Sequence, residues 1–156
     1  MRFEYSNCTV EIKKQVLDEF KKYIQTKPSK KESGGILIGR YIKDTPNAIV
    51  DLCTTPQPED RQKRYFFKRS KKYHQEILDL IWEKSNSTQN YLGEWHTHPE
   101  LRPIPSSHDL KEWGNLLSKQ NEDVRYIFFV IVGIHEICVW RGCTKCKQIL
   151  RMGMQK

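Results

Sequence analysis

The chain has 156 residues, of which 27 are Lys or Arg and 19 are Asp or Glu, so its formal net charge is +8. This length suffices for a hydrophobic core and predicts a single domain over residues 1–156. No apolar run reaches the roughly 18 residues of a membrane span, and the N-terminus lacks the basic start and apolar segment of a secretory signal. We therefore expect a cytoplasmic protein that does not enter a membrane.

Five cysteines are scattered through the sequence, at positions 8, 53, 138, 143 and 146. An odd number without an export signal argues against a disulfide framework, so we expect reduced thiols. Cys143 and Cys146 form a CxxC, but neither a second CxxC nor a histidine pair accompanies it to complete four zinc ligands. We interpret this CxxC as a turn or edge feature rather than a metal or redox site.

Short apolar or alternating runs bounded by turn residues predict the strands. These runs lie at residues 2–6, 34–42, 48–53, 65–67, 91–96, 124–131 and 136–140. The first is expected at the edge of the sheet. The polar, proline-bearing segment 54–63 predicts a mobile loop, and the last ten residues are basic and weakly patterned.

Three helices are predicted from apolar residues that recur at helical spacing. Their candidate N-caps are Thr9, Ser70 and Ser106, and the first two helices would reach about residues 26 and 84. The stripes expected to face the core are Ile12, Val16 and Phe20, then Tyr73, Ile77 and Ile81, then Leu110, Trp113 and Leu117. This order of elements predicts an α/β fold in which helices sandwich a mixed β-sheet.

Seven basic residues and no acidic residue occur between positions 61 and 73. They are Arg61, Lys63, Arg64, Lys68, Arg69, Lys71 and Lys72. Such a cluster can hold phosphates or an acidic protein surface, and it can equally be a solvated face. Nucleic-acid binding would rest on charge alone, and we do not expect it.

The stretch from Gly93 to Asp109 has the pattern of a metal site. Residues two apart on a strand project from the same face, so His96 and His98 point together. Three prolines then make a stiff connector that can turn the chain back, and Ser106 caps a helix with Asp109 in its first turn. His-x-His and Ser-x-x-Asp are each ordinary alone, but two imidazoles and one carboxylate with an open fourth position are typical of a catalytic zinc site.

These residues resemble the zinc motif of the JAMM (JAB/MPN) metalloprotease family. The match consists of His96-Thr97-His98-Pro99, Ser106 and Asp109, and upstream Glu32 with the glycine-containing strand after it is similar to the family's glutamate. The resemblance covers about residues 32–140 and implies a JAB/MPN, cytidine-deaminase-like architecture.

The resemblance also implies a role for each residue of the motif. His96, His98 and Asp109 would bind Zn²⁺, Glu32 would act as the general base, and Ser106 would stabilise the oxyanion. No further cofactor is implied. Glu94 departs from the aromatic residue expected at its position in the family, and its role is left open.

The implied reaction is hydrolysis of an isopeptide or peptide bond after the C-terminal tail of a ubiquitin-like modifier or another conjugated protein. The chain looks like the short stand-alone bacterial members of the family. Some of these are deconjugases of anti-phage (CBASS) operons, where they release a nucleotidyltransferase from protein conjugates. The substrate tail would add as a strand to a sheet edge, with the strand from Ala48 and the loop 54–63 bordering the groove.

Two other functions are compatible with parts of the sequence. A zinc nucleobase deaminase would use His74-Gln75-Glu76 and Cys143-x-x-Cys146, but Gly142 stands where its motif needs proline, and His74 is expected on a polar helix face. A non-catalytic MPN-type scaffold is the other alternative. Inactive family members lack the metal ligands, whereas this sequence retains the full set.

Overall fold

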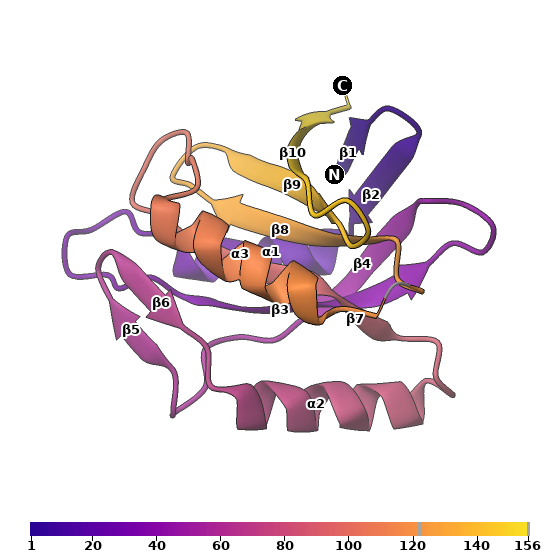
Figure 1. Ribbon diagram of the computed structural model, residues 1–156. Coiled ribbons are helices and arrows are strands. Elements are labelled where there is room, and N and C mark those ends of the chain that lie inside the picture. The colour runs from indigo at the N-terminus through magenta and orange to yellow at the C-terminus, as the bar shows by residue number, and fades with distance from the viewer. Residues whose placement is uncertain (122, 156) are drawn as a thin grey trace.

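The computed structural model describes residues 1–121 and 123–155. Eight strands form a closed barrel in the order β1-β10-β9-β8-β7-β3-β4-β2 (Figure 1). These strands are β1 Arg2–Tyr5, β2 Cys8–Ile12, β3 Gly34–Tyr41, β4 Ala48–Cys53, β7 Asn90–Thr97, β8 Tyr126–Val132, β9 Ile137–Cys143 and β10 Ile149–Met154. The β2–β4 and β7–β8 pairs are parallel and the other neighbours are antiparallel.

The predicted α/β fold with a mixed sheet is confirmed, but the sheet is not an open layer between helices. Strand β1, expected at an edge, pairs with both β2 and β10. Strand β10 comes from the final residues, to which we assigned no element, and it joins β1 to β9. Closure of the barrel therefore gives both terminal strands backbone partners on two sides.

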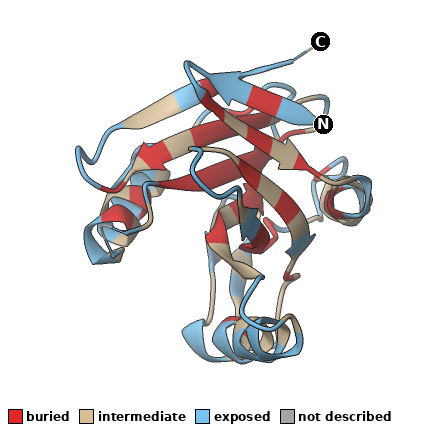
Figure 2. Ribbon diagram, turned by 90° about the vertical axis from the view of Figure 1, so that its right-hand side faces the viewer, coloured by how far each residue is buried: buried red, intermediate tan, exposed pale blue. Residues whose placement is uncertain are grey.

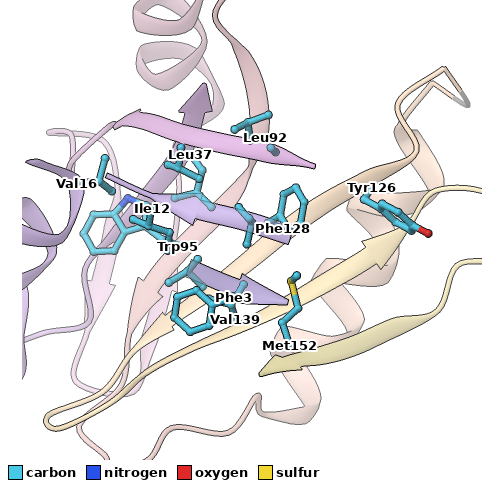
Figure 3. Packing of buried hydrophobic residues seen from close by; sticks show 14 of the residues in the cluster. Phe3, Ile12, Val16, Leu37, Leu92, Trp95, Tyr126, Phe128, Val139 and Met152 are labelled. Atoms are coloured by element: carbon cyan, nitrogen blue, oxygen red, sulfur yellow. The ribbon is translucent and has the colours of Figure 1, made fainter. Parts of the chain in front are cut away.

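Two apolar clusters hold the strands together. The first fills the barrel and includes Phe3, Leu37, Trp95 and Phe128 (Figure 3). The second lies outside β8 and β9, under helix α3 (Ser107–Lys119), where the rings of Trp113 and Phe129 stack at 4.5 Å. Alternate residues of β8 serve the two clusters, which is why this strand is buried along its whole length.

Helix α1 (Lys14–Tyr23) is shorter than predicted. The expected N-cap Thr9 instead lies in β2, which pairs with β1 and β4 and buries Cys8, Val10 and Ile12 on its inner face. Ile12 thus reaches the core from a strand, while Val16 and Phe20 do so from the helix, as predicted. The spacing of these apolar residues suits both structures, and strand pairing decided between them.

The other two helices begin where expected but are buried differently. Helix α2 (Lys71–Lys84) follows Ser70, yet its predicted stripe is only half-buried and its fully buried side chain is His74. Figure 2 shows α2 with much of its surface exposed. In α3, Trp113 and Leu117 are buried as predicted, whereas Leu110, which we expected to face the core, is 45% exposed.

A two-stranded hairpin stands outside the barrel. It consists of β5 (Arg61–Lys63) and β6 (Phe66–Lys68), so the segment predicted as a loop over 54–63 ends in a strand. Figure 1 shows the hairpin beside α2. None of the helices in residues 1–121 and 123–155 combines the length and apolar character needed to cross a membrane.

Candidate metal centre

The end of strand β7 brings His96 and His98 together. Their rings project from the same face, and the two Nε2 atoms lie 3.0 Å apart. Thr97, between them, points the other way, accepts a hydrogen bond from the Ser33 backbone N–H and donates one to Gln25. Because Thr97 is buried and bonded on the opposite face, the strand holds both imidazoles toward the same point.

Helix α3 brings Asp109 to these histidines. Ser106 caps the helix: its hydroxyl accepts from the Asp109 N–H, and Asp109 Oδ2 accepts from the Ser106 N–H at 2.7 Å. The carboxylate oxygens lie 3.4 Å from His96 Nε2 and from His98 Nε2. Burial would raise the pKa of Asp109, but hydrogen bonds from the two imidazoles hold it well below its usual range. The group is therefore an anion at neutral pH.

The donor set fits a single metal ion. One ligand atom from each of His96, His98 and Asp109 lies within 4.8 Å of the others. Among the described residues, these three are the potential metal ligands that come together so closely. Two neutral imidazole nitrogens and one carboxylate oxygen are ligands that zinc accepts, with a fourth position left for water or substrate. The CxxC of Cys143 and Cys146 belongs to no such group.

Glu32 lies beside this cluster. Its Oε1 is 3.8 Å from His98 Nε2, and its side chain is only 8% exposed. Burial raises the pKa of Glu32 to about 7, against the opposing charge of His98. A carboxylate with a pKa near neutrality can both accept and release a proton, which is what a general base that later acts as an acid requires.

The Glu32 backbone is held by the hairpin. Its N–H donates to the Lys63 carbonyl at 2.8 Å, and its carbonyl accepts from Gln62 Nε2 at 2.9 Å. Gln62 also donates to the Ser33 hydroxyl at 3.1 Å. We did not single out Gln62 from the sequence, where it is one polar residue within a basic stretch and carries no motif.

The Ser106 hydroxyl is already engaged. It donates to Asp109 Oδ2 at 2.6 Å while accepting from the Asp109 N–H. A hydroxyl has a single hydrogen to donate, so it would have to turn away from Asp109 to serve a substrate oxygen. With Oδ2 satisfied by Ser106, Oδ1 is the carboxylate oxygen that remains available to a metal.

Glu94, whose role was left open, pairs with Arg69. The Arg69 Nη2 atom lies 2.6 Å from Glu94 Oε1, and the two side chains are 17% and 21% exposed. The Tyr91 hydroxyl donates to the same oxygen at 3.4 Å. This ion pair therefore links strand β7 to the residue just before Ser70, the N-cap of α2. His108 is exposed, with its ring 5.6 Å from that of Phe66.

The prediction for His74 was wrong, since its side chain is fully buried rather than on a polar face. Its Nδ1 contacts the Thr54 hydroxyl at 2.5 Å, and its Nε2 contacts Asp60 Oδ2 at 3.0 Å. This chain of three side chains ties α2 and the segment 54–60 to strand β3, where the Ile36 N–H donates to Thr54. No cysteine joins His74, so the deaminase alternative has no structural support among the described residues.

The fold and this cluster together define a compact α/β domain with a candidate mononuclear metal site of two histidines and one aspartate. Residues 13–142 match the family model described as prokaryotic homologs of the JAB domain. The chain therefore belongs to the JAB (JAMM) family, as the resemblance of its motif implied.

Curated relatives agree with this assignment. A protein of Pseudomonas aeruginosa named CD-NTase/cGAS isopeptidase is 39% identical over 120 residues, which are 77% of this chain and 74% of that protein. A protein of the same name from Vibrio cholerae is 35% identical over 138 residues, covering 88% and 83%. The solution structure of protein DSY2949 from Desulfitobacterium hafniense aligns over 91% of this chain and 88% of its own, with a TM-score of 0.59 at 17% identity, and so shares the fold.

Proposed function

We propose that this chain is a zinc-dependent isopeptidase that releases a protein, of the nucleotidyltransferase or ubiquitin-like class, from the conjugate in which its C-terminal tail is linked to a target. The convergence of His96, His98 and Asp109 beside Glu32 carries the proposal. The name shared by the Pseudomonas and Vibrio relatives supports the class of substrate. The role proposed in anti-phage defence follows from the resemblance to the short bacterial deconjugases. The five cysteines are free thiols, in keeping with a reducing, cytoplasmic setting.

The donor set would hold the ion through His96 Nε2, His98 Nε2 and one oxygen of Asp109. Zinc bound there supplies Lewis acidity, which polarises a carbonyl and makes water acidic enough to lose a proton near neutral pH. The remaining chemistry is assigned to the side chains of this chain.

Glu32 takes the proton of the attacking water. The water oxygen forms a bond to the carbonyl carbon, the C–N bond then breaks, and the same carboxyl returns the proton to the leaving amine. Burial raises the pKa of Glu32 to about 7, and the charge of a bound zinc ion would favour the ionised carboxylate that accepts the proton.

Ser106 stabilises the negative charge that develops on the carbonyl oxygen. For this its hydroxyl must exchange the hydrogen bond to Asp109 for one to the substrate, which is a rotation about a single side-chain bond. Removing one such donor costs on the order of 10²–10³ in kcat in other hydrolases, and we expect a loss in this range for Ser106→Ala.

Metal content and activity measured on the same variants test the proposal. Elemental mass spectrometry of the purified wild type should find about one zinc per chain, and the double variant His96→Ala, His98→Ala should lose it. Glu32→Gln should keep the metal and lose cleavage of a conjugate by about 10²–10⁴-fold. His135→Ala is the control, because His135 is exposed in the turn between β8 and β9 and its loss should change neither property.

Two results would contradict the proposal. Zinc retained by the double variant would move the metal to another part of the chain, such as Cys143 and Cys146. A wild type that binds no metal and cleaves no conjugate would favour the scaffold alternative.

A further inference from the structure

The β5–β6 hairpin presents two chemically different faces. Gln62 and Phe67, directly opposite each other, face the site: Gln62 bonds to Glu32, and Phe67 lies so close to Gly34 that an added Cβ would be 2.6 Å from its ring. Alternation along the two strands places Arg61, Lys63, Phe66 and Lys68 on the opposite face. We call Arg61, Lys63 and Lys68 the cationic hairpin face, and all three residues are exposed.

Within the part of the chain that the structure describes, none of the three cations forms an ion pair with an acidic side chain. Arg61 is directly opposite Lys68 in the hairpin register. Like charges directly across a strand pair destabilise it, so this arrangement opposes folding of the hairpin rather than aiding it.

The hairpin borders the candidate metal centre. Its strand β5 is bonded to the backbone of Glu32, and Phe66 of β6 lies against His108 in the first turn of α3. Next to β5 is a cavity of about 300 Å³ whose lining includes Lys30, Lys31, Ser33 and Gln62. Lys31 is exposed and precedes Glu32 directly. Basic residues thus lie on the side of the candidate metal centre where Glu32, the proposed general base, is located.

We propose that the cationic hairpin face binds an acidic stretch of the conjugated protein and so helps to select the substrate. The inference rests on the proposed function, because it assigns the surface to a polypeptide that reaches Glu32. Charge and spacing favour this occupant, because three cations on two three-residue strands lie within about 10 Å, the length over which an extended acidic segment presents two or three carboxylates.

Two charge-reversal variants distinguish an effect of the cationic hairpin face from an effect of the protein's overall charge. The hairpin variant is Arg61→Glu, Lys63→Glu, Lys68→Glu, and the control variant is Lys43→Glu, Lys84→Glu, Lys119→Glu. The control residues are exposed and lie away from β5 and β6, and both variants lose the same positive charge. Binding of a fluorescein-labelled peptide of alternating Glu and Gly is measured by anisotropy at low salt, beside a thymidine oligonucleotide of equal charge.

The hairpin variant should bind the acidic peptide about tenfold more weakly than the wild type, since three exposed ion pairs together amount to about 1.4 kcal/mol. The control variant should bind like the wild type, and circular dichroism should show all three proteins folded. With a cleavable conjugate as substrate, the hairpin variant should raise KM about tenfold relative to the control variant.

Three results would overturn the inference: equal weakening in both variants, no binding of the peptide by the wild type, or hairpin-dependent binding of the oligonucleotide that is tighter than that of the peptide. Peptide binding needs no cleavage, so it can be judged separately from the proposed function. A wild type that binds the peptide through the hairpin but cleaves no conjugate would sink the proposed function and leave the acidic-segment site standing.

Discussion

The side-chain amide of Gln62 donates a hydrogen bond of 2.9 Å to the backbone carbonyl of Glu32, so a hairpin outside the barrel holds the proposed general base. We expect Gln62→Leu to lower kcat about tenfold with little change in KM, because a misplaced base weakens proton transfer without affecting substrate contacts. Steady-state kinetics on a conjugate measure both parameters.

Gln75→Leu is the matched control for this change. Gln75 is exposed on α2, where it donates to Asp79, and its loss should leave kcat unchanged. A Gln62→Leu variant with wild-type kcat, or one in which KM alone rises, would show that Gln62 does not position Glu32.

The buried His74 should make stability depend on pH. Burial lowers its pKa, although Asp60 acts in the opposite direction. Below its ordinary pKa of about 6.5, the unfolded chain takes up a proton that the folded chain resists. The contribution of His74 is therefore fully present above that pH and is lost as pH falls below it.

Replacing His74 tests this directly. His74→Leu leaves Thr54 and Asp60 without their imidazole and should lower the free energy of unfolding by about 1–3 kcal/mol at neutral pH, measured by urea denaturation. Subtracting the variant's pH profile from that of the wild type should reveal the loss below about pH 6.5. The exposed His135→Leu serves as the control, and an identical pH profile for wild type and His74→Leu would refute the assignment.

The Arg69–Glu94 pair is expected to stabilise the fold and to take no part in catalysis. Glu94→Leu or Arg69→Met alone leaves a mostly buried charge unpaired and should cost about 1.5–3 kcal/mol of unfolding free energy. The double variant should recover most of this loss, because both charges are gone. A double-mutant cycle in urea measures the coupling, and additive losses would mean that the two side chains act independently.

Removing the metal should destabilise the protein. A ligand that binds only the folded state adds about 4 kcal/mol when it is present at a thousand times its Kd. A chelator should therefore lower the Tm of the wild type, by roughly 2–4 °C for each kcal/mol lost. It should not lower that of His96→Ala, His98→Ala. Equal shifts in both proteins in thermal denaturation would place the metal elsewhere.

The sequence predicted those parts of the candidate site whose residues lie on the same strand or in the same helical turn. Residues two apart on a strand face the same side, so His96 and His98 could be paired from spacing alone. Ser106 and Asp109 predicted the start of a helix, and the structure shows a reciprocal capping box there. The family could also be recognised, since its motif depends on these short spacings. The roles of Glu32, Ser106 and the three metal ligands stay predictions.

Only the tertiary structure decided the features that depend on distant pairing. Residues 8–12 form a strand because β1 and β4 lie beside them, and β10 forms because it closes the barrel between β1 and β9. His74 became a buried link because the segment carrying Asp60 folds back over α2. The sequence near each of these segments does not show whether it becomes a strand or a helix, or whether a polar side chain is buried. The reason is that each outcome depends on contacts with residues far away in the chain.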